Sequence, residues 1–191
     1  MQLLKEAILR DGVGIGTEIV KVDCFLNHRI DVGLSTAMGQ AFYEAFREDQ
    51  VDLILTVEAS GIAPAITTAQ SFGNIPVVFA KKGDHRNVGS DVYTAQVYSF
   101  THQKMNTVCV SRKYLPAGSR VLIIDDFLAN GEAIEGLREI IRQAGCTLAG
   151  AGVCVEKGFQ PGGQKLRDAG VKVVSLAVVD AIVDGKIVLR D

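Results

Sequence analysis

Residues 121–133 read Val-Leu-Ile-Ile-Asp-Asp-Phe-Leu-Ala-Asn-Gly-Glu-Ala, and this order decides the fold expected of the chain. The first four residues are uniformly apolar, which is typical of a short buried strand in a parallel sheet. Two carboxylates and a turn of small residues follow, and then an amphipathic helix. Its apolar face carries Ala133, Leu137, Ile140, Ile141 and Ala144, and Gly145 is its natural end. A strand, a turn and a helix in this order predict a crossover unit of an α/β sheet.

The same stretch predicts a binding site for a ribose phosphate. Asp125 and Asp126 follow the strand, at the edge where open α/β sheets bind their ligands. The small residues 129–131 precede a helix whose first turn offers unpaired N–H groups and partial positive charge to a phosphate. Because neighbouring strand residues point to opposite faces, both carboxylates reach one sugar only if the strand has ended before them. The alternative is that one aspartate caps the helix and the other is solvated.

Composition sets the class of protein. At 191 residues, with 48% hydrophobic and 22% charged residues, the chain resembles an ordinary globular protein with a single domain over residues 1–191. Its net charge of -2 argues against nucleic-acid binding, and no apolar segment is long enough to span a membrane. The first ten residues indicate a short helix rather than a signal peptide. The cysteines form no close-spaced pair, so we expect reduced thiols and a cytoplasmic location.

Strand and helix patterns alternate along the chain. Helices are predicted at residues 34–46, 62–72 and 163–169, besides the one that follows Gly131. Strands are predicted at residues 53–57, 76–80, 95–100, 107–110, 149–155 and 172–178, besides 121–124. A final pair at 181–183 and 186–189 is joined by Asp184 and Gly185, a hairpin-type turn. The fold class is therefore α/β, with a doubly wound and mostly parallel sheet flanked by helices.

Three other places could carry chemistry. Ser60 and Gly61 follow the strand at 53–57, either as a plain helix cap or as a turn whose free amides hold pyrophosphate. Lys81 and Lys82 open a polar loop at 83–91, which is either a solvated edge or a lid over an anionic substrate. His85 and Arg86 are candidates only through this lid.

Lys157 follows the strand at 149–155, on the sheet edge expected for Asp125. It is either a surface lysine paired with Glu156 or a donor that favours a base with an oxo group. Phe159 is expected to pack rather than to stack on a base. The glycines at 12, 14 and 16 suggest a nucleotide loop only superficially, because no strand precedes them and the third glycine of the dinucleotide pattern is missing.

Together these residues carry a resemblance to a known family. The segments are residues 21–28, 58–64, 77–82, 97–100 and 121–132. They resemble the type I purine phosphoribosyltransferases, and in particular the bacterial members that use xanthine. The similarity runs over nearly the whole chain. It implies a small hood of terminal segments beside the sheet, a homodimer, and a phosphoribosyl pyrophosphate substrate complexed with Mg²⁺. The magnesium is then held mainly by substrate and water rather than by a metal site of the protein.

The resemblance also implies roles for individual residues. Val20, Asn27 and Lys157 would contact the purine, while Ser60 and Gly61 match the pyrophosphate turn. The phosphoribosyl group would be bound by Ala129, Asn130, Gly131, Glu132 and Ala133. Two departures stand out. The loop at 83–91 matches the family poorly, and Glu132 replaces an uncharged residue, so we expect its backbone to contribute while its side chain faces solvent.

The implied reaction is transfer of the phosphoribosyl group to xanthine, giving xanthosine 5′-monophosphate and pyrophosphate. Asp125 and Asp126 would fix the sugar hydroxyls and favour the positive charge that develops on the ribose, while Lys81 and Lys82 would stabilise the leaving group. Guanine and hypoxanthine are alternative acceptors. A regulator that senses phosphoribosyl pyrophosphate would need a DNA-binding module that the chain has no residues for, and an inactive assembly subunit would not need an intact phosphate loop.

Overall fold

The fold is known from a computed structural model that describes residues 1–83, 90–99 and 104–191. Its helices are α1 (Gln2–Asp11), α2 (Val32–Phe46), α3 (Ile62–Ser71), α4 (Glu132–Gln143) and α5 (Gly162–Asp168). Its strands are β1 (Val13–Ile15), β2 (Ile19–Lys21), β3 (Leu53–Val57), β4 (Val77–Lys82), β5 (Val92–Ser99), β6 (Lys104–Ser111), β7 (Arg120–Leu128), β8 (Thr147–Lys157), β9 (Val173–Val183) and β10 (Lys186–Leu189).

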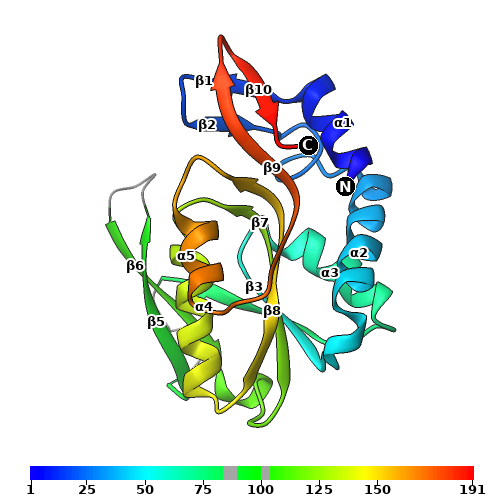
Figure 1. The fold of residues 1–191 in the computed structure, drawn as a ribbon. Coiled ribbons are helices and arrows are strands. Elements are labelled where there is room, and N and C mark those ends of the chain that lie inside the picture. The colour runs from blue at the N-terminus through cyan, green and yellow to red at the C-terminus, as the bar shows by residue number, and fades with distance from the viewer. Residues whose placement is uncertain (84–89, 100–103) are drawn as a thin grey trace.

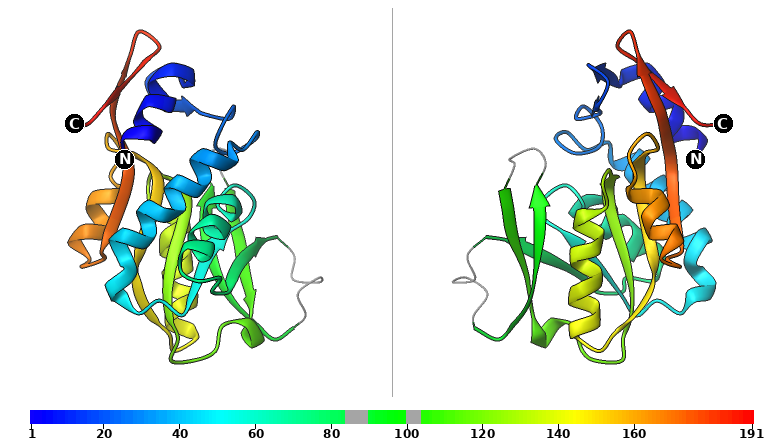
Figure 2. Two further views of the ribbon diagram at one scale, coloured as in Figure 1. Left: turned by 90° about the vertical axis from the view of Figure 1, so that its right-hand side faces the viewer. Right: turned by 60° about the vertical axis from the view of Figure 1, so that its left-hand side comes forward.

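A mostly parallel sheet forms the centre of the molecule. Within the described residues its order is β10-β9-β8-β7-β3-β4-β6-β5. The run from β4 through β3, β7 and β8 to β9 is parallel, whereas β10, β6 and β5 pair antiparallel at the two edges. Crossover connections put helices on both faces, which Figures 1 and 2 show with α2 and α3 on one face and α4 and α5 on the other. The predicted α/β fold class is confirmed.

The two faces of the sheet bury separate hydrophobic clusters because neighbouring strand residues alternate. In β7, Leu122 and Ile124 join the cluster under α2 and α3, and Val121 and Ile123 join the cluster under α4. All of them are fully buried. A strand buried on both faces reads as a continuous apolar run, which is why the sequence revealed this strand so clearly.

Most strands run further than the sequence predicted, and three of them matter for the site. The strand expected at residues 121–124 continues to Leu128 and includes both aspartates, and the strand expected at 149–155 continues to Lys157. The strands expected at 172–178 and 181–183 are one strand, β9. Pairing with a neighbouring strand extends each of them, and single-sequence patterns do not report that pairing. The turn from β9 to β10 is as expected, with Asp184 and Gly185 both at positive φ.

The terminal segments form a hood at one end of the sheet, as the resemblance implies. Figure 1 shows α1, β1, β2 and β10 together above the ends of the central strands. The Met1 amino group donates to the Leu176 carbonyl, and Gly14 N donates to the Gly185 carbonyl over 3.1 Å. A Cβ at Gly14 would lie 2.4 Å from Ile182 Cγ2, so packing explains this glycine. The glycines of residues 12–16 belong to a hairpin of the hood.

All four cysteines, Cys24, Cys109, Cys146 and Cys154, are free thiols. None of the helices in the described part of the chain has the length and apolar character needed to cross a bilayer.

Close packing between β8 and α2 supplies a first prediction. Gly152 of β8 faces α2, and a Cβ there would lie 2.7 Å from both Ile124 Cδ1 and Phe42 Cδ1. We expect Gly152→Ala to lower the free energy of unfolding by about 1–3 kcal/mol, because overpacking displaces buried neighbours. Urea denaturation followed by circular dichroism measures this.

The matched control is Gly33→Ala in the first turn of α2, where the nearest atom to a new Cβ is Asp31 Oδ1 at 3.5 Å. That variant is expected to be neutral or up to about 1 kcal/mol more stable, since alanine favours a helix. Equal stability of the two variants would contradict the packing argument.

Candidate active site

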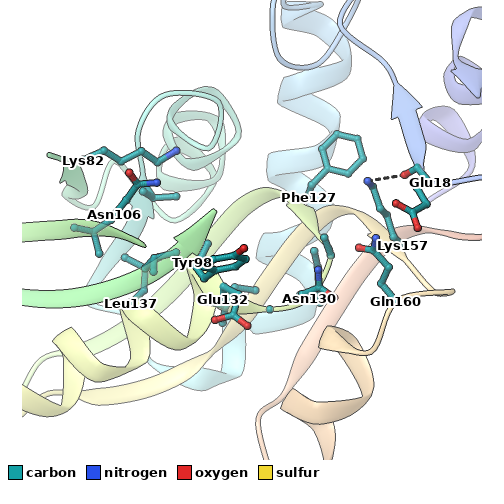
Figure 3. A pocket seen from close by; sticks show the side chains of 18 of the residues that line it. Glu18, Lys82, Tyr98, Asn106, Phe127, Asn130, Glu132, Leu137, Lys157 and Gln160 are labelled. Carbon is teal, nitrogen blue, oxygen red and sulfur yellow. Dashed lines mark hydrogen bonds between the residues drawn. The ribbon is translucent and has the colours of Figure 1, made fainter. Parts of the chain in front are cut away.

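One cavity lies where the parallel strands end. Its volume is about 860 Å³, and it is lined by Val57, Leu128 and Lys157, the last residues of β3, β7 and β8, and by Lys82 at the end of β4. The carboxyl edge of an open α/β sheet is the place where such folds bind ligands. Figure 3 shows Lys157 and Gln160 on one wall, Asn130 and Glu132 on the next, and Lys82 at the opposite end.

The loop of residues 129–131 between β7 and α4 forms the cavity wall expected to bind a phosphate. Gly131 adopts φ 90°, a left-handed conformation that favours glycine, and it precedes α4 without any capping side chain. The amides in the first turn of α4 therefore have no side-chain acceptor and are available to an anion. Glu132 and Ala133 also line the cavity. The Glu132 side chain was expected to face solvent, but the residue is only partly exposed.

The start of α5 presses directly on this loop. Gly162 N donates to the Ala129 carbonyl over 3.1 Å. A Cβ on Gly162 would lie 2.3 Å from Ala129 O and 2.5 Å from Gly131 N, so no larger residue fits without moving the loop. The backbone of α5 thus sets the shape of the loop from behind. No local sequence pattern predicts this contact, because α5 lies about thirty residues further along the chain.

A buried ion pair holds α5 in place. Glu156 is 3% exposed, and Arg167 donates to both of its carboxylate oxygens, at 2.8 and 2.6 Å. Ser175 of β9 donates to the same carboxylate. Burial alone would raise the pKa of Glu156, but the hydrogen bonds from Arg167 and Ser175 outweigh it and lower the pKa. The suggested pairing of Lys157 with Glu156 is therefore wrong.

Lys157 instead points into the cavity. Its Nζ donates to the Glu18 carbonyl in the β1–β2 turn over 2.8 Å and lies 5.9 Å from the centre of the Phe127 ring. Burial lowers the pKa of Lys157, against the opposing charge of Glu18. The hood and the sheet meet at this hydrogen bond. Lys157 is consequently not a solvated surface lysine, and it offers donors at the wall formed by Phe127 and Gln160.

Both aspartates are buried within β7. Asp125 Oδ1 accepts from the Asp126 amide over 2.9 Å, and Asp126 Oδ2 accepts from Asn27 Nδ2 over 3.0 Å. A Cβ on Gly61 would lie 2.8 Å from Asp125 Oδ1, so this carboxyl lies against the turn before α3. Burial raises the pKa of Asp125 well above its ordinary value, and the charge of Asp126 adds to the effect.

This placement corrects the expectation for the aspartates. The strand does not end before them, so the two carboxyls leave it towards different neighbours. Neither belongs to the residues that line the cavity. The alternative is wrong as well, because α4 has no side-chain cap and neither carboxyl is solvated. The two acids directly precede Phe127 and Leu128 in β7, and these two residues do line the cavity.

The turn before α3 differs from the simple cap. Gly61, not Ser60, is the residue before the helix, and no side chain caps it. The Glu58–Ala59 peptide bond is cis, and Glu58 Oε1 accepts from Lys82 N over 2.8 Å. This bond joins the turn to the end of β4. Ser60 and Gly61 are not among the cavity-lining residues, although their turn lies next to Asp125.

The two lysines that end β4 separate. Lys82 lines the cavity, whereas Lys81 lines a second hollow that also includes Phe79 and Cys109. Alternation along the strand produces this split, so a shared role at one anion is not supported for Lys81. The candidates His85 and Arg86 lie outside the described residues.

The residues expected to bind a purine are only partly brought together. Val20 is buried in the core of the hood, and the exposed Asn27 contacts Asp126, so neither lines the cavity that contains Lys157. Phe159 packs against the core, as expected. The cavity adds residues that sequence reasoning missed: Glu18, Ile19, Phe127, Tyr98, Asn106 and Gln160. Gln160 follows Lys157 by only three positions in the sequence, and this short spacing could have suggested that Gln160 lies near the site.

Comparisons with known proteins agree with this arrangement. A family model described as phosphoribosyl transferase domain matches residues 33–186. The chain is 50% identical over 190 residues to a xanthine phosphoribosyltransferase of Clostridioides difficile, with 100% of both chains covered. It is 52% identical over 188 residues to a xanthine phosphoribosyltransferase of Heliobacterium modesticaldum, covering 98% of this chain and 99% of the relative.

Among solved structures, the adenine phosphoribosyltransferase of Rhodothermus marinus superposes with a TM-score of 0.74. That match covers 93% of this chain and 99% of the other, at 18% identity, and it supports the fold alone.

The ion pair behind the phosphate loop supplies a second prediction. Arg167→Met leaves the buried Glu156 carboxylate unpaired, so we expect the free energy of unfolding to fall by about 2–4 kcal/mol at pH 7. The same loss should shrink in the double variant Glu156→Gln/Arg167→Met, which buries no charge. Because the pKa of Glu156 is lowered in the folded state, the pair stabilises above the ordinary glutamate pKa, and this stabilisation fades as the pH falls below about 4.3.

Arg142→Met is the control for this measurement, since Arg142 pairs with Glu139 on the exposed face of α4 and its side chain is 73% exposed. We expect a change below about 1 kcal/mol there. The free energy of unfolding is measured by thermal or urea denaturation. A similar loss in both arginine variants would contradict the claim that the buried pair stabilises the fold more than an exposed pair.

Proposed function

The chain belongs to the phosphoribosyltransferase family, and we propose that it transfers the 5-phosphoribosyl group of phosphoribosyl pyrophosphate to xanthine, releasing pyrophosphate. One observation carries the proposal. The cavity joins the loop of residues 129–131 to Lys157 at the carboxyl ends of β7 and β8. The curated relatives that are about half identical over the whole chain are named as xanthine phosphoribosyltransferases. A purine salvage reaction fits both facts.

The phosphate end of the substrate belongs at the start of α4. The uncapped amides after Gly131 can donate to the 5-phosphate oxygens, and each bond to a charged oxygen contributes about 1.5–3 kcal/mol. The partial positive charge of the helix terminus adds to this attraction. Glu132 would bind through its backbone, with its carboxylate turned away from the phosphate. Residues 129–133 therefore form the proposed 5-phosphate loop.

The proposed role of the two aspartates is electrostatic. As the bond to pyrophosphate breaks, positive charge develops on the sugar ring by analogy with other glycosyl transfers. Asp125 and Asp126 are fixed in β7 just before the cavity-lining Phe127 and Leu128, in surroundings that screen charge poorly. Their negative charge would favour that cationic state through the field it creates at the cavity, rather than through a direct contact in this structure. Lys82, at the far end of the cavity, would attract the departing pyrophosphate.

A magnesium ion fits this site if the substrate brings it. Mg²⁺ usually takes one or two carboxylates and completes its shell with phosphate and water. The described residues contain no group of three His, Cys, Asp or Glu side chains that could form a protein cage. Asp125 and Asp126 point to different neighbours and do not line the cavity, so they do not form such a pair. The metal would therefore be held mainly by the substrate and water, and when bound it would neutralise charge on the pyrophosphate.

The purine belongs at the wall formed by Lys157 and Phe127. Lys157 only donates, so it favours an oxo group on the base and disfavours an amino group. The Phe127 ring lies beside the ammonium and offers a flat apolar surface. Asn27 and Val20 would come into contact with the base only if the hood closes further over the cavity. Guanine and hypoxanthine also carry an oxo group and are the closest competing acceptors.

We propose in addition that the chain is one domain over residues 1–191, acts in the cytoplasm and forms a homodimer, as the family resemblance implies. A regulator that only senses phosphoribosyl pyrophosphate remains the alternative from another class, and Lys157 beside an aromatic ring speaks against it because a sensor needs no base site.

A panel of bases tests the function. Purified protein with phosphoribosyl pyrophosphate and Mg²⁺ is expected to release pyrophosphate with xanthine, more slowly with guanine and hypoxanthine, and not with adenine. Product identity as xanthosine 5′-monophosphate is checked by mass spectrometry. Release with adenine alone, or with no base in the panel, would refute the proposal.

The aspartates supply a fourth prediction. Asp125→Asn and Asp126→Asn are expected to lower turnover at least about 100-fold, because the charge that favours the ribose cation is lost. Asp125→Asn should leave the free energy of unfolding at pH 7 unchanged or raised, since the raised pKa of Asp125 shows that its charge is unfavourable in the fold.

Asp168→Asn is the control, because Asp168 is exposed on α5 and, among the described residues, its side chain accepts only from Gln164. Pyrophosphate release and urea unfolding are measured for all three variants. Near-normal turnover of either strand variant would remove that aspartate from the mechanism.

A further inference from the structure

The first turn of α5 is held between the loop of residues 129–131 and a buried carboxylate. Figures 1 and 2 show α5 beside α4, on the same face of the sheet. A Cβ on Gly162 would overlap the loop, as described above. A Cβ on Gly163 would overlap Glu156 Oε1 and would lie 2.6 Å from Glu156 Cδ. Two consecutive glycines thus let the backbone of α5 fit between the two groups.

The position of α5 comes from its contacts with other elements. The helix has seven residues and no side chain caps its start, so it is too short to be stable by itself. Leu166 packs into the hydrophobic cluster under α4, and Arg167 joins the last turn of α5 to both oxygens of Glu156. Ser175 of β9 donates to the same carboxylate. Because β8 pairs with β7 on one side and β9 on the other, this carboxylate stands on a rigid base.

The chemistry of the Glu156–Arg167 pair favours a positioning role over a purely stabilising one. Apolar side chains of similar volume often stabilise a fold as well as a buried ion pair does. The ion pair adds direction, because the two parallel bonds from a planar guanidinium fit only one orientation of a carboxylate. The pair is therefore suited to hold α5 in one position relative to β8.

The position of α5 sets the orientation of one peptide group in the loop. Gly162 N donates to the Ala129 carbonyl over 3.1 Å. The Ala129–Asn130 peptide bond is trans, and the C=O and N–H of a trans peptide point in opposite directions. The Asn130 N–H therefore points away from α5. A peptide turned the other way would present its carbonyl oxygen in place of this donor, and an oxygen with partial negative charge would repel a phosphate.

Resting on the function proposed above, we propose that Glu156, Arg167 and Ser175 are positioning residues for the 5-phosphate of the substrate. None of the three touches the substrate. They hold α5 against the loop, and the bond from Gly162 to Ala129 then keeps the loop amides in the orientation that binds the anion. The 5-phosphate is remote from the bond that breaks, so its contacts contribute equally to the ground state and the transition state. Losing the cluster should raise KM for phosphoribosyl pyrophosphate and leave kcat nearly unchanged.

A double variant removes the ion pair without leaving a buried charge. Glu156→Gln/Arg167→Met keeps the sizes of both side chains, and Ser175→Ala removes a single hydrogen bond from the same carboxylate. The matched control is Glu139→Gln/Arg142→Met, because Arg142 donates to both oxygens of Glu139 on the exposed face of α4. Urea unfolding checks that each variant is folded at the assay temperature.

The measurement isolates the contribution of the phosphate. For each protein, kcat and both KM values are measured, together with the inhibition constants of xanthosine and xanthosine 5′-monophosphate, two ligands that differ only by the 5-phosphate. The ratio of the two inhibition constants reports how much the phosphate adds to binding. We expect KM for phosphoribosyl pyrophosphate to rise about 10-fold in the double variant and about threefold in Ser175→Ala, the effect of weakening bonds to a charged oxygen. The ratio should fall by the same factors.

The other constants separate positioning from a loss of folded protein. In both variants kcat, KM for xanthine and the inhibition constant of xanthosine should stay within about twofold, whereas partial unfolding would lower kcat and leave both KM values unchanged. The control pair should match the wild type in every constant.

The ratio in the double variant decides the outcome. A fall of about fivefold or more, with an unchanged control, supports the positioning role, and a smaller fall overturns it however much stability is lost. If the double variant is unfolded in the assay, Ser175→Ala decides instead, with a threshold of about twofold.

The wild-type protein separates this role from the function. If it makes xanthosine 5′-monophosphate and the ratio stays constant in the variants, only the positioning role is lost. If it makes no nucleotide from xanthine, or binds the nucleotide no more tightly than xanthosine, the proposed function fails and the positioning role fails with it.

Discussion

The active site depends on one close backbone contact, that of Gly162 against the loop of residues 129–131. The two backbones touch because neither Gly131 nor Gly162 carries a side chain, and a Cβ on Gly162 would overlap the loop. Glu156 and Arg167 then hold α5 against the loop through a buried carboxylate. A phosphate loop built from small residues is flexible by itself, so its shape must come from such a support. The support reaches it from a part of the chain thirty residues further on.

The same short segment of chain serves the other end of the cavity. Glu156 and Lys157 are neighbours in β8 and therefore point to opposite faces of the sheet. The first anchors α5 behind the phosphate loop, and the second enters the cavity and donates to the Glu18 carbonyl in the hood. The proposed base site and the proposed phosphate site are thus positioned by consecutive residues of one strand. A displacement of β8 would disturb both ends of the substrate together.

The sequence predicted the elements whose signals are local. The apolar run at 121–124 and the helical pattern after Gly131 predicted β7 and α4 correctly, with a turn of small residues between them. The sequence did not reveal where strands end, because strand length is set by pairing with neighbours, and so Asp125 and Asp126 were expected outside a strand that contains them. It paired Lys157 with the adjacent Glu156, whereas the true partner of Glu156 comes from α5. Contacts between distant segments have no signature in one sequence.

Two adjacent buried carboxyls in one strand are unfavourable for the stability of the fold. The proposed substrate gives them a possible role. The raised pKa of Asp125 means that the fold disfavours the ionised form of this carboxyl. Burial is the main cause, and the charge of the neighbouring Asp126 adds to it. A cationic ribose or a substrate-borne magnesium ion would supply the compensation that the protein lacks. In the proposed mechanism, the reacting complex would relieve this electrostatic strain, and strain relieved in the transition state accelerates a reaction.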